Sequence, residues 1–330
     1  MADSKLSTSY MGLELRNPII VASSDLTKTA EGMKKCEDAG AGAIVLKSLF
    51  EEQFLVEGDI PATDSAMYPE ALDYMRSGGL LEYAPAQLCR EIEQAKAEVK
   101  IPIIASINCQ TSSLWPRFAR QVEEAGADGL ELNIYNLPID PRVSCAEHDS
   151  RYFRTITDVK ENISIPISVK LIPQISSLPY LADRMAEAGC QGLVFFNWFL
   201  EPDIDVKKLR TYSRKGQPNF NQALRWVALL ADRIGTDLSA SGGVRNADDV
   251  IKQILAGAKA VQICSLFYQK GLDVIRDLLA GIEAWMGEHK FAALEDFRGE
   301  LSFKKQELSF RDLGEASSYF RAQYLKIYSN

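Results

Sequence analysis

Several features that would mark a particular class of protein are scarce in this chain of 330 residues. It has six cysteines and two histidines. They form no CxxC pair and no metal-ligand spacing, so the sequence predicts no metal site and no iron–sulfur ligands. No stretch approaches the ~18 consecutive apolar residues of a membrane span, and the first residues lack the apolar core of a signal peptide. The net charge is −8, and no basic stripe with interleaved aromatics occurs. We therefore expect a protein of the reduced cytoplasm without nucleic-acid or membrane partners.

What is present is a repeated pattern. A helix-like stretch ends in Ala-Gly four times and then runs into an apolar, strand-like stretch. The glycine suits the position after a helix, where the backbone turns left-handed, and the apolar run is typical of a strand buried on both faces. The four junctions are at Ala39-Gly40, Ala125-Gly126, Ala188-Gly189 and Ala256-Gly257.

Three further apolar runs open with a proline, which is tolerated at the first residue of a strand. They begin at Pro18, Pro102 and Pro166, and Leu238–Ser241 adds one more strand. The eight expected strands are 18–24, 41–48, 101–109, 129–135, 165–172, 192–198, 237–242 and 260–266. Helical periodicity fills the gaps between them. This alternation predicts an α/β fold, a single (β/α)8 TIM barrel.

Three connections are longer than a minimal barrel needs, at about 51–85, 136–148 and 199–220. All of them follow strand carboxyl ends, so we expect them to cover that face of the barrel as lid or substrate-binding elements. No second domain with its own core is apparent. We therefore predict one domain over residues 1–330, in which 288–330 is a terminal extension with docking surface.

Small or polar groups stand at nearly every strand end, where barrels of this type carry their chemistry. Lys47 and Lys170 lie within apolar runs, so each ammonium must pair with an anion, lose its proton or reach solvent. One interpretation is that both extend to the barrel rim and reach solvent. The other is that they flank a bound anion or an electron-rich ring. The strand-end residues are Ala22, Ser23, Lys47, Ser48, Asn108, Asn133, Lys170, Asn197, Ser241, Gly242, Gly243, Cys264 and Ser265.

The Ser241-Gly242-Gly243 turn follows strand seven, where barrels often bind phosphate. Two glycines let a ligand approach bare backbone amides. A phosphate there, amide side chains at strands three and four and cations at strands two and five suit flavin mononucleotide (FMN), whose reduced ring a lysine would stabilise. We expect both ammonium groups and the glycine turn to converge on one cavity.

The sequence resembles the dihydroorotate dehydrogenase family over most of its length. The resemblance is carried, in order, by Leu15-Arg16-Asn17-Pro18 with Ala22-Ser23, Gly40–Ala43 leading to Lys47-Ser48, Glu131-Leu132-Asn133, Val169-Lys170-Leu171, Ser241–Val244 with Gln262–Ser265, and Phe297–Ser302. It implies an FMN-dependent oxidoreductase of the soluble branch that oxidises dihydroorotate to orotate in pyrimidine biosynthesis. It also implies that the strand-end residues other than Asn197 contact FMN, that Asn197 binds substrate, and that the chain is a homodimer. Fumarate, or NAD through a partner subunit, would be the electron acceptor.

The sequence departs from the family where the substrate should lie. The soluble branch follows its fourth-strand Asn with Leu-Ser-Cys-Pro-Asn, and that cysteine is the catalytic base. Here the run is Asn133-Ile134-Tyr135-Asn136-Leu137-Pro138, so Asn136 stands in its place, and an amide cannot take a proton at neutral pH. We keep Asn136 as a substrate-binding candidate. The family's orotate-binding loop after strand two is not evident either.

Cys145, in the same connection, is the candidate base, with His148 nearby to activate it. The alternative is an ordinary loop cysteine. Lys47 is the second residue expected to take part in catalysis.

Three other functions stay open. A diverged FMN-dependent enzyme would act on another cyclic amide or unsaturated substrate. A Schiff-base aldolase would use Lys170 as its nucleophile. A protein without the base would bind flavin and remain catalytically silent.

Overall fold

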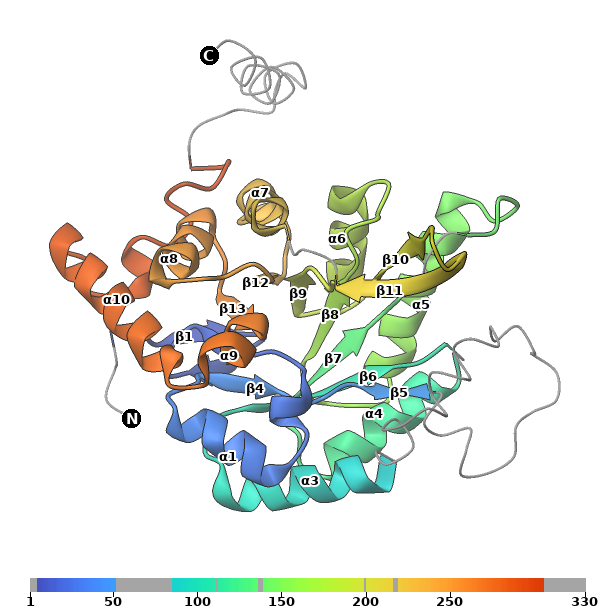
Figure 1. The fold of residues 1–330 in the computed structure, drawn as a ribbon, viewed down its shortest axis with the longest axis horizontal. Coiled ribbons are helices and arrows are strands. Elements are labelled where there is room, and N and C mark those ends of the chain that lie inside the picture. Colours follow the sequence, from blue (N-terminus) through green and yellow to red (C-terminus); the bar gives the residue numbers. More distant parts are fainter. Residues whose placement is uncertain are drawn as a thin grey trace, which may run out of the picture.

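Eight parallel strands form a closed barrel in the structure, a computed structural model that describes residues 5–51, 85–110, 112–135, 139–198, 200–215 and 219–305 (Figure 1). Each strand pairs with the next along the chain, and the last pairs with the first. The strands are β3 (Ile19–Val21), β4 (Ala43–Val45), β6 (Ile103–Asn108), β7 (Gly129–Asn133), β8 (Ile167–Leu171), β9 (Gly192–Phe195), β12 (Asp237–Ser241) and β13 (Ala260–Ile263). Each lies inside its predicted range, so the (β/α)8 prediction is confirmed.

Helices follow the strands and pack around the outside of the barrel (Figure 1). On α4 and α6 one face of each helix is buried, with Phe118 and Val122 on α4 and Leu181 and Met185 on α6. No helix in the part of the chain that the structure describes is long and apolar enough to cross a bilayer. The helices are α1 (Ala30–Asp38), α3 (Pro85–Glu98), α4 (Leu114–Glu124), α5 (Cys145–Lys160), α6 (Leu178–Glu187), α7 (Phe220–Leu230), α8 (Ala247–Ala256), α9 (Ser265–Lys270) and α10 (Val274–His289), with 3-10 turns η1 (Asp25–Thr27) and η3 (Leu294–Asp296).

The Ala-Gly junctions and the prolines noted in the sequence stand where strands begin. The glycines of the four Ala-Gly junctions have φ between 97° and 115°, the left-handed region that ends a helix. The carbonyls of Pro18, Pro102 and Pro166 each accept a hydrogen bond from a neighbouring strand. A proline at a strand start thus keeps the acceptor and gives up only a donor that the ladder does not need.

A hairpin of β1 (Thr8–Tyr10) and β2 (Leu13–Leu15) covers the amino-terminal end of the barrel, away from the β10–β11 hairpin (Figure 1). Tyr10 and Met11 are buried against the bore. A Cβ atom on Gly192 would lie 2.8 Å from the Tyr10 hydroxyl and 2.7 Å from Cγ of Met11. The missing side chain at the start of β9 therefore makes room for the hairpin.

The long connections take different forms. The one after β9 contains a two-stranded sheet of β10 (Leu200–Asp205) and β11 (Arg210–Lys215). Most of the one after β4 lies outside the described residues, apart from β5 (Leu49–Phe50), which pairs with β6. The predicted connection at 136–148 ends earlier than expected. Helix α5 begins at Cys145 because the Ser144 side chain accepts a hydrogen bond from the N–H of Glu147 and caps it.

The first part of the predicted extension packs against the barrel helices. Backbone N–H groups of Gly299 and Leu301 donate to carbonyls of α8, and that of Phe303 donates to a carbonyl of α7. Phe297 is fully buried. This part of the extension is therefore held against the barrel, whereas residues 306–330 lie outside the described residues. The docking surface and the single-domain prediction for 1–330 stay predictions.

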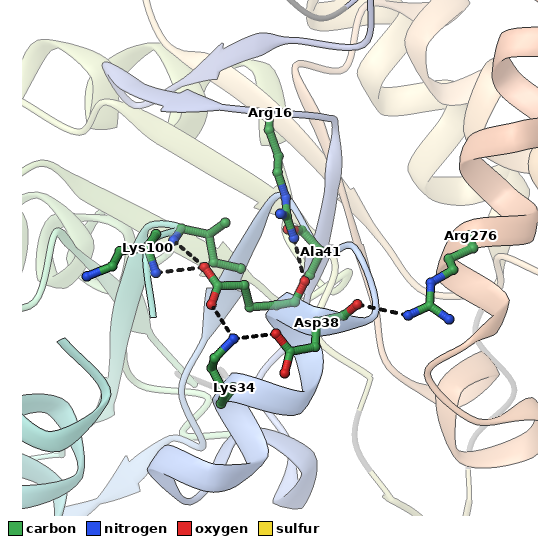
Figure 2. Close-up of polar contacts among 8 residues, drawn as sticks. Arg16, Lys34, Asp38, Ala41, Lys100 and Arg276 are labelled. Atoms are coloured by element: carbon green, nitrogen blue, oxygen red, sulfur yellow. Dashed lines mark hydrogen bonds and ion pairs between the residues drawn. The ribbon is translucent and has the colours of Figure 1, made fainter. Parts of the chain in front are cut away.

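A polar network ties the carboxyl end of α1 to three other segments (Figure 2). The Glu37 carboxylate accepts hydrogen bonds from the N–H groups of Lys100, at 2.7 Å, and of the following residue. Arg16 donates to the Glu37 carbonyl at 2.6 Å, and Arg276 of α10 donates to the Asp38 carbonyl at 3.0 Å. The last carbonyls of α1, which have no partner within the helix, are thereby satisfied, and the wall of the barrel around β4 is fixed.

Candidate functional site

A cavity of about 210 Å³ lies at the carboxyl ends of the barrel strands. Most of the residues predicted to bind a cofactor line it, and they come from the ends of four different strands. Those lining it are Ala22, Ser23, Lys170, Ser241, Gly242, Gly243, Cys264 and Ser265, and the predicted substrate residue Asn197 lies beside them. The rest of the wall is made by Phe196, Trp198, Val244, Gln262 and Ile263, to which we gave no role from the sequence.

The glycine turn after β12 borders the cavity, with φ of 97° at Gly242 and 77° at Gly243. A Cβ atom on Gly243 would lie 2.9 Å from Cβ of Phe220, at the start of α7. The need for glycine at 243 therefore comes from its left-handed backbone and from the approach of α7.

The amino end of α8 is capped by side chains of its own segment. The Asn246 side chain accepts a hydrogen bond from the N–H of Asp249. The buried Asp249 carboxylate accepts from the N–H of Arg245. Residues 245–249 do not line the cavity, so an anion there would meet the Gly242–Val244 segment and Cys264-Ser265 at the start of α9.

Lys170 lines the cavity, and its ammonium has partners inside the barrel. Its Nζ donates to Oε1 of Gln262 at 3.2 Å and lies 3.9 Å from Oε1 of Glu131. Nε2 of Gln262 donates to Oε2 of Glu131 at 2.6 Å. All three residues are buried. Of the possibilities that the sequence left open for Lys170, the structure shows pairing with an anion, which the chain itself supplies from β7.

Lys47 takes a different direction. Its ammonium forms an ion pair with the exposed carboxylate of Asp25, on η1, and Lys47 is not among the residues that line the cavity. The expectation that both lysines converge on one cavity is therefore not met in this structure. The physical reason is that a carboxylate on the loop after β3 lies within reach of the Lys47 side chain.

A chain of hydroxyl groups connects the strand end that carries Lys47 with the cavity. Oγ of Ser23, which lines the cavity, lies 3.0 Å from Oγ of Ser48 and accepts the N–H of Ser48 at 2.8 Å. Oγ of Ser48 lies 2.7 Å from Oγ of Ser106, inside the barrel. The predicted residues Ser23 and Ser48 therefore do come together.

The amide side chains lie at the ends of β6 and β7. Asn108 and Asn133 are buried, and Nδ2 of Asn197 donates to Oδ1 of Asn133 at 2.6 Å. Because Asn197 lines the cavity, this bond places Asn133 next to it. Asn108 and Asn133 do not themselves line the cavity as the chain stands.

Cys145 is the exposed member of the six cysteines, all of which lie in described segments. Its sulfur is 3.8 Å from Oγ of Ser176, on the loop after β8. The ring nitrogens of His148 are buried and have no hydrogen-bond partner among the described residues, so no bond to Cys145 is formed. Asn136 lies outside the described residues. The assignment of the base to Cys145 stays a prediction.

A larger hollow of about 560 Å³ lies at the opposite end of the barrel, beside Met11, Asp237 and Lys259. Burial raises the pKa of Asp237, whose carboxylate accepts the N–H of Met11 at 2.8 Å. In barrels of this class the chemistry occurs at the carboxyl ends of the strands, and residues at the other end serve stability. We therefore assign this hollow no part in the site.

Glu131 and Gln262 are the residues that sequence reasoning missed. Glu131 lies between two leucines in β7, as Lys170 lies between apolar neighbours in β8. The argument that required a partner for the buried lysine applied equally to this carboxylate. Pairing the two would have predicted the contact.

A sequence profile of the family described as Dihydroorotate dehydrogenase matches residues 5–286. The chain belongs to the dihydroorotate dehydrogenase family. A catalytic subunit of dihydroorotate dehydrogenase B (NAD(+)) from Thermoplasma acidophilum is 27% identical over 310 residues, which are 91% of this chain and 99% of that protein. A protein of Aeropyrum pernix, provisionally named as dihydroorotate dehydrogenase A (fumarate), is 29% identical over 303 residues, 89% and 97% of the two chains.

A more distant relative carries a different name. The chloroplastic dihydropyrimidine dehydrogenase (NADP(+)) of Arabidopsis thaliana is 23% identical over 325 residues, 89% of this chain and 76% of that protein. The dihydroorotate dehydrogenase family thus places this chain among oxidoreductases that act on a CH–CH bond.

Proposed function

We propose that this protein is an FMN-dependent oxidoreductase that oxidises dihydroorotate, or a closely related cyclic amide, at the CH–CH bond. One observation carries the proposal. The cavity at the strand carboxyl ends is bordered both by a buried lysine, Lys170, and by the Gly242-Gly243 turn with Ser265. A ligand with an electron-rich ring and a phosphate matches this combination of groups.

The donors around the cavity fit a flavin phosphate. The Gly242–Val244 segment and Ser265, the first residue of α9, supply backbone N–H groups, since the first N–H groups of a helix have no partner within it. Ser265 adds a hydroxyl. These neutral donors suit a phosphate dianion. Lys170, Ser23 and Asn133 would then hold the ring, and Ala22, Ser48, Asn108, Ser241 and Cys264 complete the proposed set.

The size of the cavity limits how much of the ligand it holds. Its volume of about 210 Å³ is below the ~300–1,000 Å³ of pockets that enclose a whole cofactor. It suits the phosphate end and the edge of the ring beside Lys170. The remainder must extend toward Asn197 and the connections at the barrel mouth, with shifts of side chains such as Trp198, whose Nε1 donates to the Ser241 carbonyl at 3.3 Å.

FMN and the residues of the chain would supply different parts of the chemistry. When bound, FMN supplies a two-electron acceptor whose reduced ring carries negative charge. The ammonium of Lys170 lies where it stabilises that charge, and Lys47 is proposed to assist it. Asn133 and Asn197 would orient the substrate by hydrogen bonds. Cys145 is the proposed base that removes a proton next to a carbonyl.

The substrate is the least constrained part of the proposal. The run Asn133-Ile134-Tyr135-Asn136 lacks the cysteine of the soluble branch, and one relative is named for reduced pyrimidines in place of dihydroorotate. A related cyclic amide is therefore the second candidate substrate. A Schiff-base aldolase is disfavoured, because the Lys170 nitrogen that would act as nucleophile is engaged by the Gln262 oxygen and lies beside the Glu131 carboxylate.

Anaerobic titration of the purified protein tests the proposal. We expect yellow protein whose flavin absorbance bleaches when dihydroorotate is added. Yellow protein that only dihydropyrimidines bleach would favour the related enzyme. Colourless protein that takes up no added FMN would refute the cofactor and with it the function.

The names of the relatives support a choice of electron acceptor. Their names include NAD(+) and fumarate, so we propose fumarate, or NAD through a partner subunit, as acceptor. Steady-state assays with each acceptor distinguish them. The homodimer and the cytoplasmic location stay predictions, and gel filtration with light scattering tests the first.

A further inference from the structure

A buried ion pair lies directly beneath the proposed flavin site. Its cation, Lys170, comes from β8 and its anion, Glu131, from the neighbouring strand β7. Gln262 reaches them from β13, across the bore. The exposed fraction is 7% for Lys170 and zero for Glu131. Neither group can be solvated by bulk water, so each depends on the other for its charge.

The hydrogen bonds fix the direction of the Gln262 amide. Its oxygen accepts from the Lys170 ammonium, and its nitrogen donates to the Glu131 carboxylate. Turned the other way, the amide would set N–H against ammonium and oxygen against carboxylate. Gln262 thereby joins the two charges at a point where Lys170 and Glu131 are 3.9 Å apart.

Tyr10, which interacts with the charge of Glu131, and Cys190, which lies near Tyr10, are both neutral at ordinary pH. Burial raises the pKa of Tyr10 well above its usual value, and the charge of Glu131 raises it further. Burial also raises the pKa of Cys190 to about 12. Asp237 is the remaining carboxylate near Tyr10, and it lies at the far end of the barrel. The carboxylate that faces Lys170 is therefore that of Glu131.

The ammonium of Lys170 keeps donors for a ligand. It carries three N–H groups, and among the described residues its one hydrogen bond is to Gln262. Oε1 of Glu131 is at ion-pair distance and accepts no hydrogen bond within that part of the chain. Since Lys170 also lines the cavity, the remaining donors are available at the cavity floor.

We propose that Glu131 is a positioning residue that acts through Lys170 and Gln262: it holds Lys170 as a cation at the cavity floor. Its importance for redox chemistry rests on the proposed function, but its effect on the Lys170 charge does not. Without the carboxylate, a nearly fully buried ammonium loses its counter-charge, and burial then favours the neutral amine.

The direct test measures the charge of Lys170 without a flavin. Full-length protein stripped of any FMN is acetylated with a trace of acetic anhydride, a reagent small enough for the cavity, between pH 6 and 11. Peptide mass spectrometry reads the modification of Lys170, which requires the neutral amine. In Glu131→Gln we expect reactivity to begin at least about one pH unit lower than in the unchanged protein, or roughly tenfold more labelling at pH 8. Equal labelling of Lys170 in the two proteins at every pH would overturn the proposal.

Two variants calibrate this result. Glu131→Asp keeps the charge and should label within about threefold of the unchanged protein. Ser239→Ala removes a buried hydroxyl of the bore that has no hydrogen-bond partner among the described residues and should leave Lys170 unaffected. Early labelling in Ser239→Ala as well would show a merely structural effect and would also count against Glu131.

If Glu131→Gln folds poorly, the stability of a double variant to urea tests the proposal in place of the labelling. Removing one member of a buried pair leaves an uncompensated charge, whereas removing both does not. The double variant Glu131→Gln with Lys170→Gln should therefore be more stable to urea than Glu131→Gln alone. A double variant no more stable than the single one would contradict the proposal.

The link to the cofactor has its own readout. In protein that holds FMN, Glu131→Gln should lower the reduction potential of the flavin at alkaline pH, where Lys170 has lost its proton, and leave it closer to the unchanged value at low pH. If the protein holds no FMN, this arm refutes the proposed function while the labelling still decides the role of Glu131.

Discussion

Nδ2 of Asn197 donates a hydrogen bond of 2.6 Å to Oδ1 of Asn133, joining the segment after β9 to the end of β7 across the width of β8. Because the oxygen of Asn133 is engaged, its N–H groups remain to donate to a ligand. The hydrogen bond thus fixes the two amide side chains relative to each other beside the cavity.

Asn197→Ala should therefore raise the KM for the oxidised substrate by about five- to tenfold, the size of one lost hydrogen bond to a ligand. The proposed FMN contacts remain, so flavin content should not change. Steady-state kinetics and the flavin-to-protein absorbance ratio measure both. Asn162→Ala, in the loop that follows α5, is the matched control. An unaltered KM in Asn197→Ala would remove this residue from the substrate site.

The ion pair of Lys47 with Asp25 makes the role of this lysine testable. If Lys47 leaves Asp25 to assist the bound flavin, Lys47→Met should lower turnover at least about tenfold, while Asp25→Asn should keep it within about twofold. Stopped-flow reduction of the flavin by substrate measures the step. Equal losses in both variants would mean that the ion pair serves structure alone.

Replacing the proposed base should greatly slow the reaction. Cys145→Ser should slow flavin reduction by about 10²–10⁴, the range for loss of a general base. Cys89→Ser, on α3, should not, because its thiol lies away from the strand ends and burial raises its pKa. Full activity in Cys145→Ser would show that Cys145 is not the catalytic base.

Gly243 offers a test of the turn itself. Gly243→Ala should destabilise the protein by about 1–3 kcal/mol, because alanine is strained at a φ of 77°, and its methyl group would also meet Phe220. Gly287→Ala, in α10 with no atom near the new methyl group, should be neutral or stabilising by up to about 1 kcal/mol. Urea unfolding compares the two. A harmless Gly243→Ala would show that the turn adjusts readily.

The pKa of Asp237 predicts how stability depends on pH. Because burial raises this pKa in the folded protein, the stability contributed by the protonated carboxyl is complete below the unfolded pKa and is lost as pH rises through the folded pKa. Asp237→Asn should therefore be more stable than the unchanged protein at pH 7, with a gain that shrinks as pH is lowered. Asp158→Asn, exposed on α5, should show no such trend. Urea unfolding from pH 4 to 7 gives the answer, and a gain independent of pH would contradict it.

The barrel could be predicted because its signals are local. Ala-Gly junctions and strand-opening prolines act within a few residues, and seven of the eight strands lie where these signals place them. The strand-end side chains followed from that order. Most of them border one cavity because parallel strands bring their carboxyl ends to the same face.

The partners of the two lysines could not be predicted in the same way. Asp25 reaches Lys47 from an exposed turn after another strand, and no periodicity marks it. Gln262 meets Lys170 across the bore, a contact set by the stagger of strands that do not adjoin. The start of α5 was misplaced because Ser144, one cap among many polar loop residues, decides it.

The hairpin that buries Tyr10 and Met11 at the amino-terminal end has a kinetic consequence. With that end sealed, the polar centre of the barrel opens at one mouth. A dissolved oxidant such as fumarate must then enter where the reduced substrate enters, and the two must take turns. For such an acceptor, we expect parallel lines in double-reciprocal plots and inhibition by either reactant at high concentration.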